Sequence, residues 1–178
     1  MPLLHPGDTF PELALTVPGG NTVLMPEAFA GESGVLLFYP GSWCSCCNAQ
    51  LLALQRAAAG FRVAALSVDD EATVASVIAE HSLTFPIGFG ADAHAVADLT
   101  GAFINPDPVF LQSTWFVLDP RGKVVACLYS SGDRRSAQAR KQGWGGLPGP
   151  RGRPGVRLKH WAMRWAQGSQ QHSFGIVH

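Results

Sequence analysis

The 178-residue sequence lacks the features that mark exported, membrane-spanning and zinc-binding chains. Its first residues, MPLLHPGDTF, include no basic region followed by an apolar one, so we expect no secretory signal. No apolar run approaches the roughly 20 residues that a membrane-spanning helix needs. A second C-x-x-C and an H-x-x-x-H are also missing, which argues against a structural zinc site built from two ligand pairs. We therefore expect a cytoplasmic protein without a metal site or a membrane partner.

Cysteine is scarce, and its distribution is uneven. Three of the four cysteines fall within the stretch FYPGSWCSCCNAQL, as Cys44, Cys46 and Cys47. Without an export signal the thiols should be mostly reduced, which favours reactive or buried thiols over a disulfide framework. A C-x-x-C that follows an apolar run and precedes a helical pattern indicates thiol chemistry more often than a structural bridge.

Charge divides the chain into two parts. Residues 1–132 carry 12 acidic and 4 basic side chains, whereas residues 133–178 carry 1 acidic and 9 basic ones. The second part includes GWGGLPGPRGRPG, in which glycine and proline prevent regular structure. We therefore predict one α/β domain over residues 1–132 and a basic tail over residues 133–178 that is largely irregular.

The tail has several interpretations. Its arginines alternate with tryptophans, a pattern that in a nucleic-acid protein would supply phosphate contacts and stacking, but we do not expect nucleic-acid binding here. A solvated tail is the simpler alternative. Our leading hypothesis is a change of reading frame in a GC-rich gene, since the composition switches abruptly after SSG. Leu158, Trp161, Ala162 and Trp165 have the spacing of a short amphipathic helix.

The hydrophobic pattern predicts alternating strands and helices in the first part. We expect buried strands at residues 35–39 and 62–68, a short extended segment at 85–89, and a final hairpin of residues 114–118 and 123–129 around Asp-Pro-Arg-Gly. A first helix should begin near the cysteines and end at a C-cap at Gly60. A second helix should carry Asp69, Asp70 and Glu71 in its first turn. A third should run over residues 92–100, with Leu99 inward and Gly101 as its stop. A small hairpin or an edge strand should precede them. This order predicts a mixed sheet in a thioredoxin-like α/β fold.

The position of the cysteines favours a reactive thiol. The first turn of a helix presents unpaired N–H groups and a positive dipole end, which stabilise a thiolate. Two thiols three residues apart can also close a disulfide, so that one attacks and the other resolves. Because ligands gather at the carboxyl ends of strands in open α/β sheets, the loop after residues 35–39 is the expected site.

The segment FYPGSWCSCCNAQL resembles the active site of the redoxin family, the peroxiredoxins of the alkyl hydroperoxide reductase and thiol-specific antioxidant group. GDTFPEL, ALSVDD and WFVLDPRGKVV are similar to other parts of that family, and the resemblance covers about residues 7–132. It implies a three-layer thioredoxin fold and a thiol peroxidase or thiol reductase that needs no metal or organic cofactor. It also implies a thioredoxin-like dithiol protein as reductant, and it is compatible with a homodimer.

Two assignments of the cysteines follow from the resemblance. The peroxiredoxin pattern P-x-x-x-T-x-x-C falls on Pro40, Cys44 and Cys47, with Cys44 in place of the usual Thr or Ser. It implies that Cys47 attacks peroxide and that Cys44 resolves the sulfenic acid to a disulfide. The thioredoxin pattern W-C-x-x-C, which begins at Trp43, implies instead that Cys44 attacks a disulfide substrate. A non-catalytic thioredoxin-fold interaction module with idle thiols is the third alternative.

The remaining candidates have smaller predicted roles. The family places an Arg, and thioredoxins a cis-Pro, just before the final hairpin, but this sequence has Leu-Gln-Ser-Thr at residues 111–114. Without these groups, peroxide activation is expected to rest on the helix terminus and the loop N–H groups, with the Thr114 hydroxyl as a further candidate, which predicts a slower peroxidase than the best of the family. Cys46 is either an extra thiol that could take part in the site with Cys44 or an incidental substitution in the loop, and we favour the second interpretation. Cys127 is expected to be a packed core residue. Trp43 either shapes the substrate surface or packs the loop.

Overall fold

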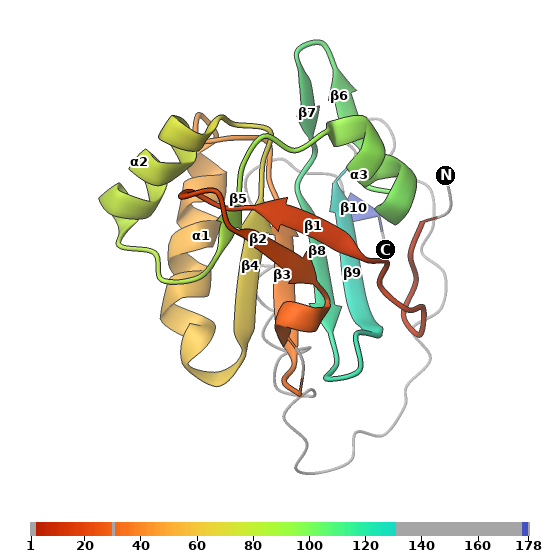
Figure 1. Ribbon diagram of the computed structural model, residues 1–178. Coiled ribbons are helices and arrows are strands. Elements are labelled where there is room, and N and C mark those ends of the chain that lie inside the picture. Colours follow the sequence, from red (N-terminus) through yellow and green to blue (C-terminus); the bar gives the residue numbers. More distant parts are fainter. Residues whose placement is uncertain (1–2, 30, 131–175, 178) are drawn as a thin grey trace.

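The computed structural model describes residues 3–29, 31–130 and 176–177, and a six-stranded mixed sheet forms its centre (Figure 1). The strand order is β10-β9-β8-β3-β4-β5, in which β3, β4 and β5 are parallel and the other neighbours pair antiparallel. The strands are β3 (Gly34–Phe38), β4 (Arg62–Leu66), β5 (Ile87–Gly88), β8 (Thr114–Leu118), β9 (Val124–Ser130) and β10 (Ile176–Val177).

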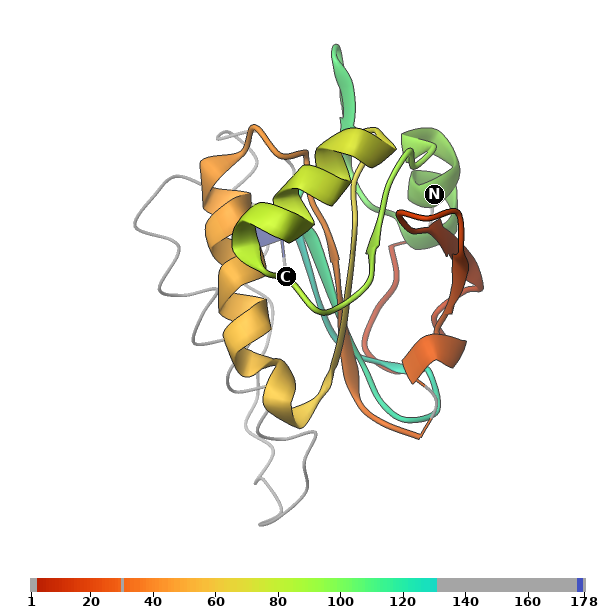
Figure 2. The same cartoon turned by 60° about the vertical axis from the view of Figure 1, so that its left-hand side comes forward.

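Helices and a hairpin cover the two faces of this sheet. On one face lie α1 (Ser45–Ala57), the 3-10 turn η2 (Ala58–Gly60) and α2 (Glu71–His81) (Figure 2). On the other face lie the hairpin of β1 (Leu13–Thr16) and β2 (Thr22–Met25), the 3-10 turn η1 (Glu27–Phe29) and α3 (Ala93–Thr100). The predicted three-layer fold and the N-terminal hairpin are therefore confirmed.

Strand β3 separates two hydrophobic cores because all five of its residues are buried. Val35 and Leu37 pack on the α1 and α2 side, whereas Leu36 and Phe38 pack on the side of the β1–β2 hairpin and α3. Side chains alternate between the faces of a strand, so a strand covered on both faces must be apolar throughout. The continuous apolar run VLLFY predicts this position.

Two predicted helix features are wrong. Helix α1 ends at Ala57 and tightens into η2, so Gly60 lies inside the 3-10 turn and is not the C-cap. Leu99 is 44% exposed, because α3 buries the face formed by Ala93, Val96, Ala97 and Thr100. The predicted stop at Gly101 is correct, since this residue caps α3 in the left-handed region at φ 76°.

The final hairpin is confirmed, but another hairpin was not predicted. Gly122 donates its N–H to the carbonyl of Asp119 at 3.0 Å and closes the turn between β8 and β9. The additional hairpin consists of β6 (Ile104–Pro106) and β7 (Val109–Leu111), and it extends away from the body of the fold (Figure 1). Its strands are only three residues long, which is too short for a pattern of alternating hydrophobicity to be detected.

The predictions for residues 133–178 fall almost entirely outside the described residues. This applies to the irregular stretch and to the amphipathic helix around Trp161; only β10 can be placed, paired with β9 at Ile176–Ser130 and Val177–Tyr129. Among the residues that the structure describes, no helix is both long and apolar enough to cross a membrane.

The start of α3 provides a test of the fold. Asp92 caps this helix by accepting hydrogen bonds from the N–H groups of His94 and Ala95 at 2.9 and 3.1 Å. We expect Asp92→Ala to lower the free energy of unfolding by about 1 kcal/mol, because two N–H groups lose their acceptor. Asp98→Ala, at an exposed acidic position of the same helix, should change it by less than about 0.5 kcal/mol. Urea unfolding measures both, and equal effects would contradict the capping role.

Candidate active site

The site forms where the chain leaves β3 and enters α1. Pro40 and Gly41 are buried, and the helix begins at Ser45. Cys44 occupies the N-cap position with an extended backbone, and no side chain caps the helix. The first turn of α1 therefore presents its N–H groups and its positive dipole end next to the sulfur atoms, which favours thiolates over thiols.

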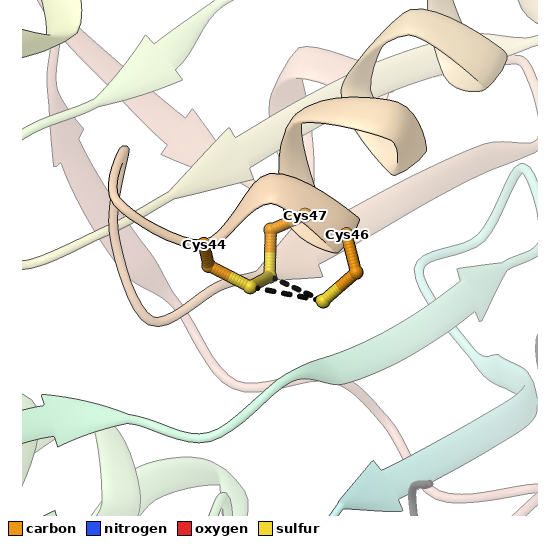
Figure 3. Close-up of side chains that lie close together, drawn as sticks. All are labelled: Cys44, Cys46 and Cys47. Atoms are coloured by element: carbon orange, nitrogen blue, oxygen red, sulfur yellow. Dashed lines mark hydrogen bonds between the residues drawn. A yellow bond between two sulfur atoms is a disulfide. The ribbon is translucent and has the colours of Figure 1, made fainter. Parts of the chain in front are cut away.

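Cys44 and Cys47 form a disulfide in this structure (Figure 3). Their Cα atoms are 5.2 Å apart, which lies within the usual range for bonded cysteines. Cys47 is 1% exposed and Cys44 is 8% exposed. The C-x-x-C spacing thus places both sulfurs at the helix start, within bonding reach of each other.

Cys46 does not point away from this pair. Its Sγ lies 3.1 Å from Cys44 Sγ and 3.9 Å from Cys47 Sγ, and Figure 3 shows the three side chains converging below the first turn of the helix. The three sulfurs form a group of metal-ligating atoms within 4.8 Å of one another. The sequence prediction treated Cys46 as incidental, and its position does not support that interpretation.

Asp69 holds the cysteine loop in place. Its Oδ2 accepts the N–H of Ser42 at 2.8 Å and the hydroxyl of Ser67 at 3.2 Å. Asn48 donates to the carbonyl of Ser42 at 2.9 Å and ties the loop to α1. Gly41 has a φ of 152°, and a side chain there would come within 2.8 Å of Asp69 Oδ1.

The prediction that Asp69 belongs to the first turn of α2 is therefore wrong, although its neighbours do have that role. Asp70 caps α2 by accepting the N–H of Thr73, and Glu71 is the first residue of the helix. The hydrogen bond to Thr73 lowers the pKa of Asp70. Sequence gives only an acidic run after a strand, and a run alone does not show which carboxylate turns back toward the neighbouring loop.

A polar pair with one buried member lies further along the same helix face. Gln50 follows Cys47 by one turn and is buried, and the Ser113 hydroxyl donates to its Oε1 at 3.5 Å. Sequence reasoning missed both residues. A polar residue in the otherwise apolar series Cys47, Leu51, Leu54 was the signal that could have identified Gln50.

Thr114 lies on the other side of the sheet from the thiols. Its hydroxyl donates to the carbonyl of Gln112 at 3.1 Å. Along β8 its side chain alternates with Trp115, which packs in the same core as Cys44 and Cys47. The placement of Thr114 therefore does not support the prediction that its hydroxyl activates peroxide.

Trp43 forms an exposed aromatic surface beside the cysteines. It is 65% exposed, and its ring meets that of Phe110 edge to face with centroids 5.2 Å apart. Phe110 belongs to β7, so the unpredicted hairpin borders the site. Both predicted roles of Trp43 are thus compatible with its position, since it contacts a neighbour and still presents a surface to solvent.

Cys127 is separated from the other cysteines by the sheet. It packs against the core that contains Phe116 and Tyr129, whereas Cys44 and Cys47 pack in the opposite core. Its thiol donates to the carbonyl of Leu4 at 3.2 Å. Burial, and secondarily the nearby Asp8 carboxylate, raise the pKa of Cys127 to about 11. It is therefore a half-buried packing residue and is not in reach of the cysteine loop.

The raised pKa of Cys127 predicts slow alkylation. In a Cys44→Ser/Cys46→Ser/Cys47→Ser variant, Cys127 is the remaining thiol, and thiolate is the species that iodoacetamide attacks. We expect the alkylation rate to be low at pH 8 and to rise with pH toward about 11. A midpoint near the roughly 8.5 of an ordinary cysteine would contradict the structural assignment.

Asp69 is expected to stabilise the whole loop. Asp69→Ala leaves the Ser42 N–H and the Ser67 hydroxyl without their acceptor, so the free energy of unfolding of the oxidised protein should fall by about 1–3 kcal/mol. Asp69→Asn keeps an acceptor oxygen of the same shape and should lose less. Urea unfolding distinguishes them, and wild-type stability of both variants would show that the contact is dispensable.

Comparison with known proteins agrees with the fold and identifies a family. The model of the AhpC/TSA family matches residues 6–127. A peroxiredoxin from Methanothermobacter thermautotrophicus is 31% identical over a 140-residue alignment; the match covers 72% of this chain and 65% of the length of that relative.

Two solved structures illustrate the shared fold. Peroxidoxin BcpB from Mycobacterium tuberculosis superposes with a TM-score of 0.63 at 20% identity, over 70% of this chain and 84% of that one. A putative thiol:disulfide interchange protein, DsbE from Chlorobium tepidum, gives a TM-score of 0.55 at 23% identity, over 70% and 84% of the respective chains. At these identities the two structures support the fold alone.

Proposed function

Because the chain belongs to the AhpC/TSA family, we propose that it is a thiol-dependent peroxide reductase with Cys44 and Cys47 as its redox pair. The observation that carries the proposal is the Cys44–Cys47 disulfide at the uncapped start of α1. A disulfide at this position corresponds to the oxidised end state of a two-thiol peroxidase cycle.

The proposed cycle has three steps. The Cys47 thiolate attacks one oxygen of the peroxide, the O–O bond breaks, Cys47 becomes a sulfenic acid, and the other oxygen leaves as water or alcohol after protonation. The Cys44 thiolate then attacks Cys47 Sγ, and the sulfenic oxygen leaves as a second water. A thioredoxin-like dithiol reduces the resulting disulfide by exchange and is itself oxidised.

The assignment of Cys47 as the attacking thiol is supported by its surroundings. It is the third residue of α1, where backbone N–H groups and the helix dipole stabilise a thiolate. Cys47 is also nearly buried. A small peroxide molecule can reach a buried sulfur more easily than a disulfide on a protein surface can. Pro40 ends β3 and Asp69 fixes the following loop, so both position the pair without taking part in bond changes.

Cysteine variants test this assignment, and a Cys46→Ser background removes the neighbouring thiol that could replace either partner. In that background we expect Cys47→Ser to abolish oxidation by hydrogen peroxide. Cys44→Ser should keep the first step and accumulate a sulfenic acid at Cys47, which dimedone traps for mass spectrometry. Stopped-flow tryptophan fluorescence follows the rates.

Cys127→Ser is the matched control for these variants and should keep the wild-type rate, because Cys127 lies across the sheet from the pair. Trapping of the sulfenic acid on Cys44 in the Cys47→Ser protein would reverse the assignment. Rapid peroxide consumption by the variant that lacks both Cys44 and Cys47 would rule out the pair altogether.

Thiol-disulfide exchange led by Cys44 is the second candidate function. It is supported by the greater exposure of Cys44 and by the exposed Trp43 beside it, which offers a surface to a protein substrate. The reduced protein should then react faster with a protein disulfide than with hydrogen peroxide, and Cys47→Ser should trap a mixed disulfide on Cys44. A higher second-order rate constant with peroxide favours the peroxidase.

A further inference from the structure

Cys46 completes a triangle of sulfur atoms that the proposed redox cycle does not use. Its Sγ is 3.1 Å from Cys44 Sγ and 3.9 Å from Cys47 Sγ even while the other two are bonded to each other (Figure 3). All three cysteines come from the N-cap and the first turn of one helix, and their side chains converge on one point. Reduction of the disulfide would leave three thiols facing a common centre.

We propose that reduced Cys44, Cys46 and Cys47 bind one Cu(I) ion through three thiolate sulfurs. Thiolates are soft ligands and select soft ions such as Cu(I). At a metal–sulfur distance of about 2.3 Å, the sulfurs of a planar three-coordinate ion lie about 4.0 Å apart. The Cys46–Cys47 separation already matches this value, and the Cys44–Cys46 separation needs to open by about 1 Å. The Cys44 and Cys47 sulfurs, which are bonded here, must also move apart to about 4.0 Å after reduction, by side-chain rotation.

The number of ligands favours Cu(I) over zinc. Structural zinc is almost always held by four protein ligands. Within the described parts of the chain, the group of potential ligands consists of these three cysteines, without a fourth His, Cys, Asp or Glu. Three sulfurs complete the coordination of Cu(I) but leave zinc one protein ligand short. The missing second ligand pair, which argues against structural zinc, therefore does not argue against Cu(I).

The surroundings hold the three sulfurs in place and favour their negative charge. Asp69 and Asn48 fix the loop through Ser42, so little ordering of the backbone is needed on binding. The uncapped N-terminus of α1 offers its positive end to the thiolates. Three thiolates and one Cu(I) carry a net charge of −2, which the helix terminus partly offsets.

Copper binding and disulfide formation are alternative uses of the same sulfurs. Binding releases three protons from three thiols and changes no oxidation state. Oxidation of Cys44 and Cys47 to the disulfide removes two ligands and leaves only Cys46. The site therefore exists in the reduced protein alone, whatever oxidant forms the disulfide, and it does not depend on the proposed peroxidase activity.

Competition with the coloured Cu(I)–bicinchoninate complex tests the site on the full chain. The protein is reduced with a phosphine, kept without oxygen and titrated, and we expect one Cu(I) per chain with three sulfur scatterers in the X-ray absorption spectrum. Cys46→Ser and Cys46→Ala should each bind Cu(I) at least roughly 10–100-fold more weakly than the wild type. That is the cost of losing a residue that only hydrogen-bonds to a metal ligand, and losing a ligand itself should cost no less. Cys127→Ser should match the wild type, and the disulfide form should take up no copper.

Several results would overturn the proposal. These are wild-type affinity in both Cys46 variants, a spectrum with two sulfur ligands, copper uptake by the disulfide form, or displacement of Cu(I) by equimolar Zn(II). A wild-type far-UV circular dichroism spectrum and urea midpoint for each Cys46 variant show that it is folded, so weak binding can be attributed to the missing ligand. The copper titration contains no peroxide, so a failure to bind copper leaves the peroxidase proposal unaffected. A failure to reduce peroxide likewise leaves the copper proposal unaffected.

Discussion

The parallel pairing of β3 with β4 is the constraint on which the site depends. It places Phe38 opposite Leu66, so the loops that follow both strands emerge at the same edge of the sheet. The N–H of Tyr39 continues the pairing with the carbonyl of Leu66 at 3.0 Å. Beyond that point Asp69 reaches Ser42 and fixes the path into α1. The direction of two buried strands thereby determines where the helix starts and where its cysteines lie.

The sheet also separates reactive from unreactive thiols. Three cysteines lie at the start of α1, beside the N–H groups that a helix terminus leaves unpaired. Cys127 lies on the opposite face, where burial favours the protonated thiol and the carbonyl of Leu4 accepts its hydrogen. The same chemical group thus behaves differently on the two faces because one environment stabilises charge and the other excludes it.

The crowding of the sulfurs gives the site two exclusive states. In the oxidised state Cys44 and Cys47 are bonded, and Cys46 is left as a single thiol beside them. Reduction would leave three thiols on the same short helical turn, which is the state that the proposed copper site requires. Trp43 and Phe110 border the site in either case, so a partner that exchanges thiols would contact the β6–β7 hairpin as well as the loop.

The sequence by itself determined the order of the central strands and the helices, though not the short β6–β7 hairpin, because apolar runs and helical spacing depend on neighbours along the chain. It also determined that Cys44 and Cys47 form the pair, since three-residue spacing at a helix start allows little else. Tertiary structure alone decided which side chains join them. The inward turn of Cys46 depends on the phase of the first helical turn, the contact of Asp69 with Ser42 joins two loops, and the burial of Gln50 requires a sheet beneath it. The first depends on the exact residue at which the helix begins, and the other two on packing between segments distant in sequence, and spacing along one segment encodes neither.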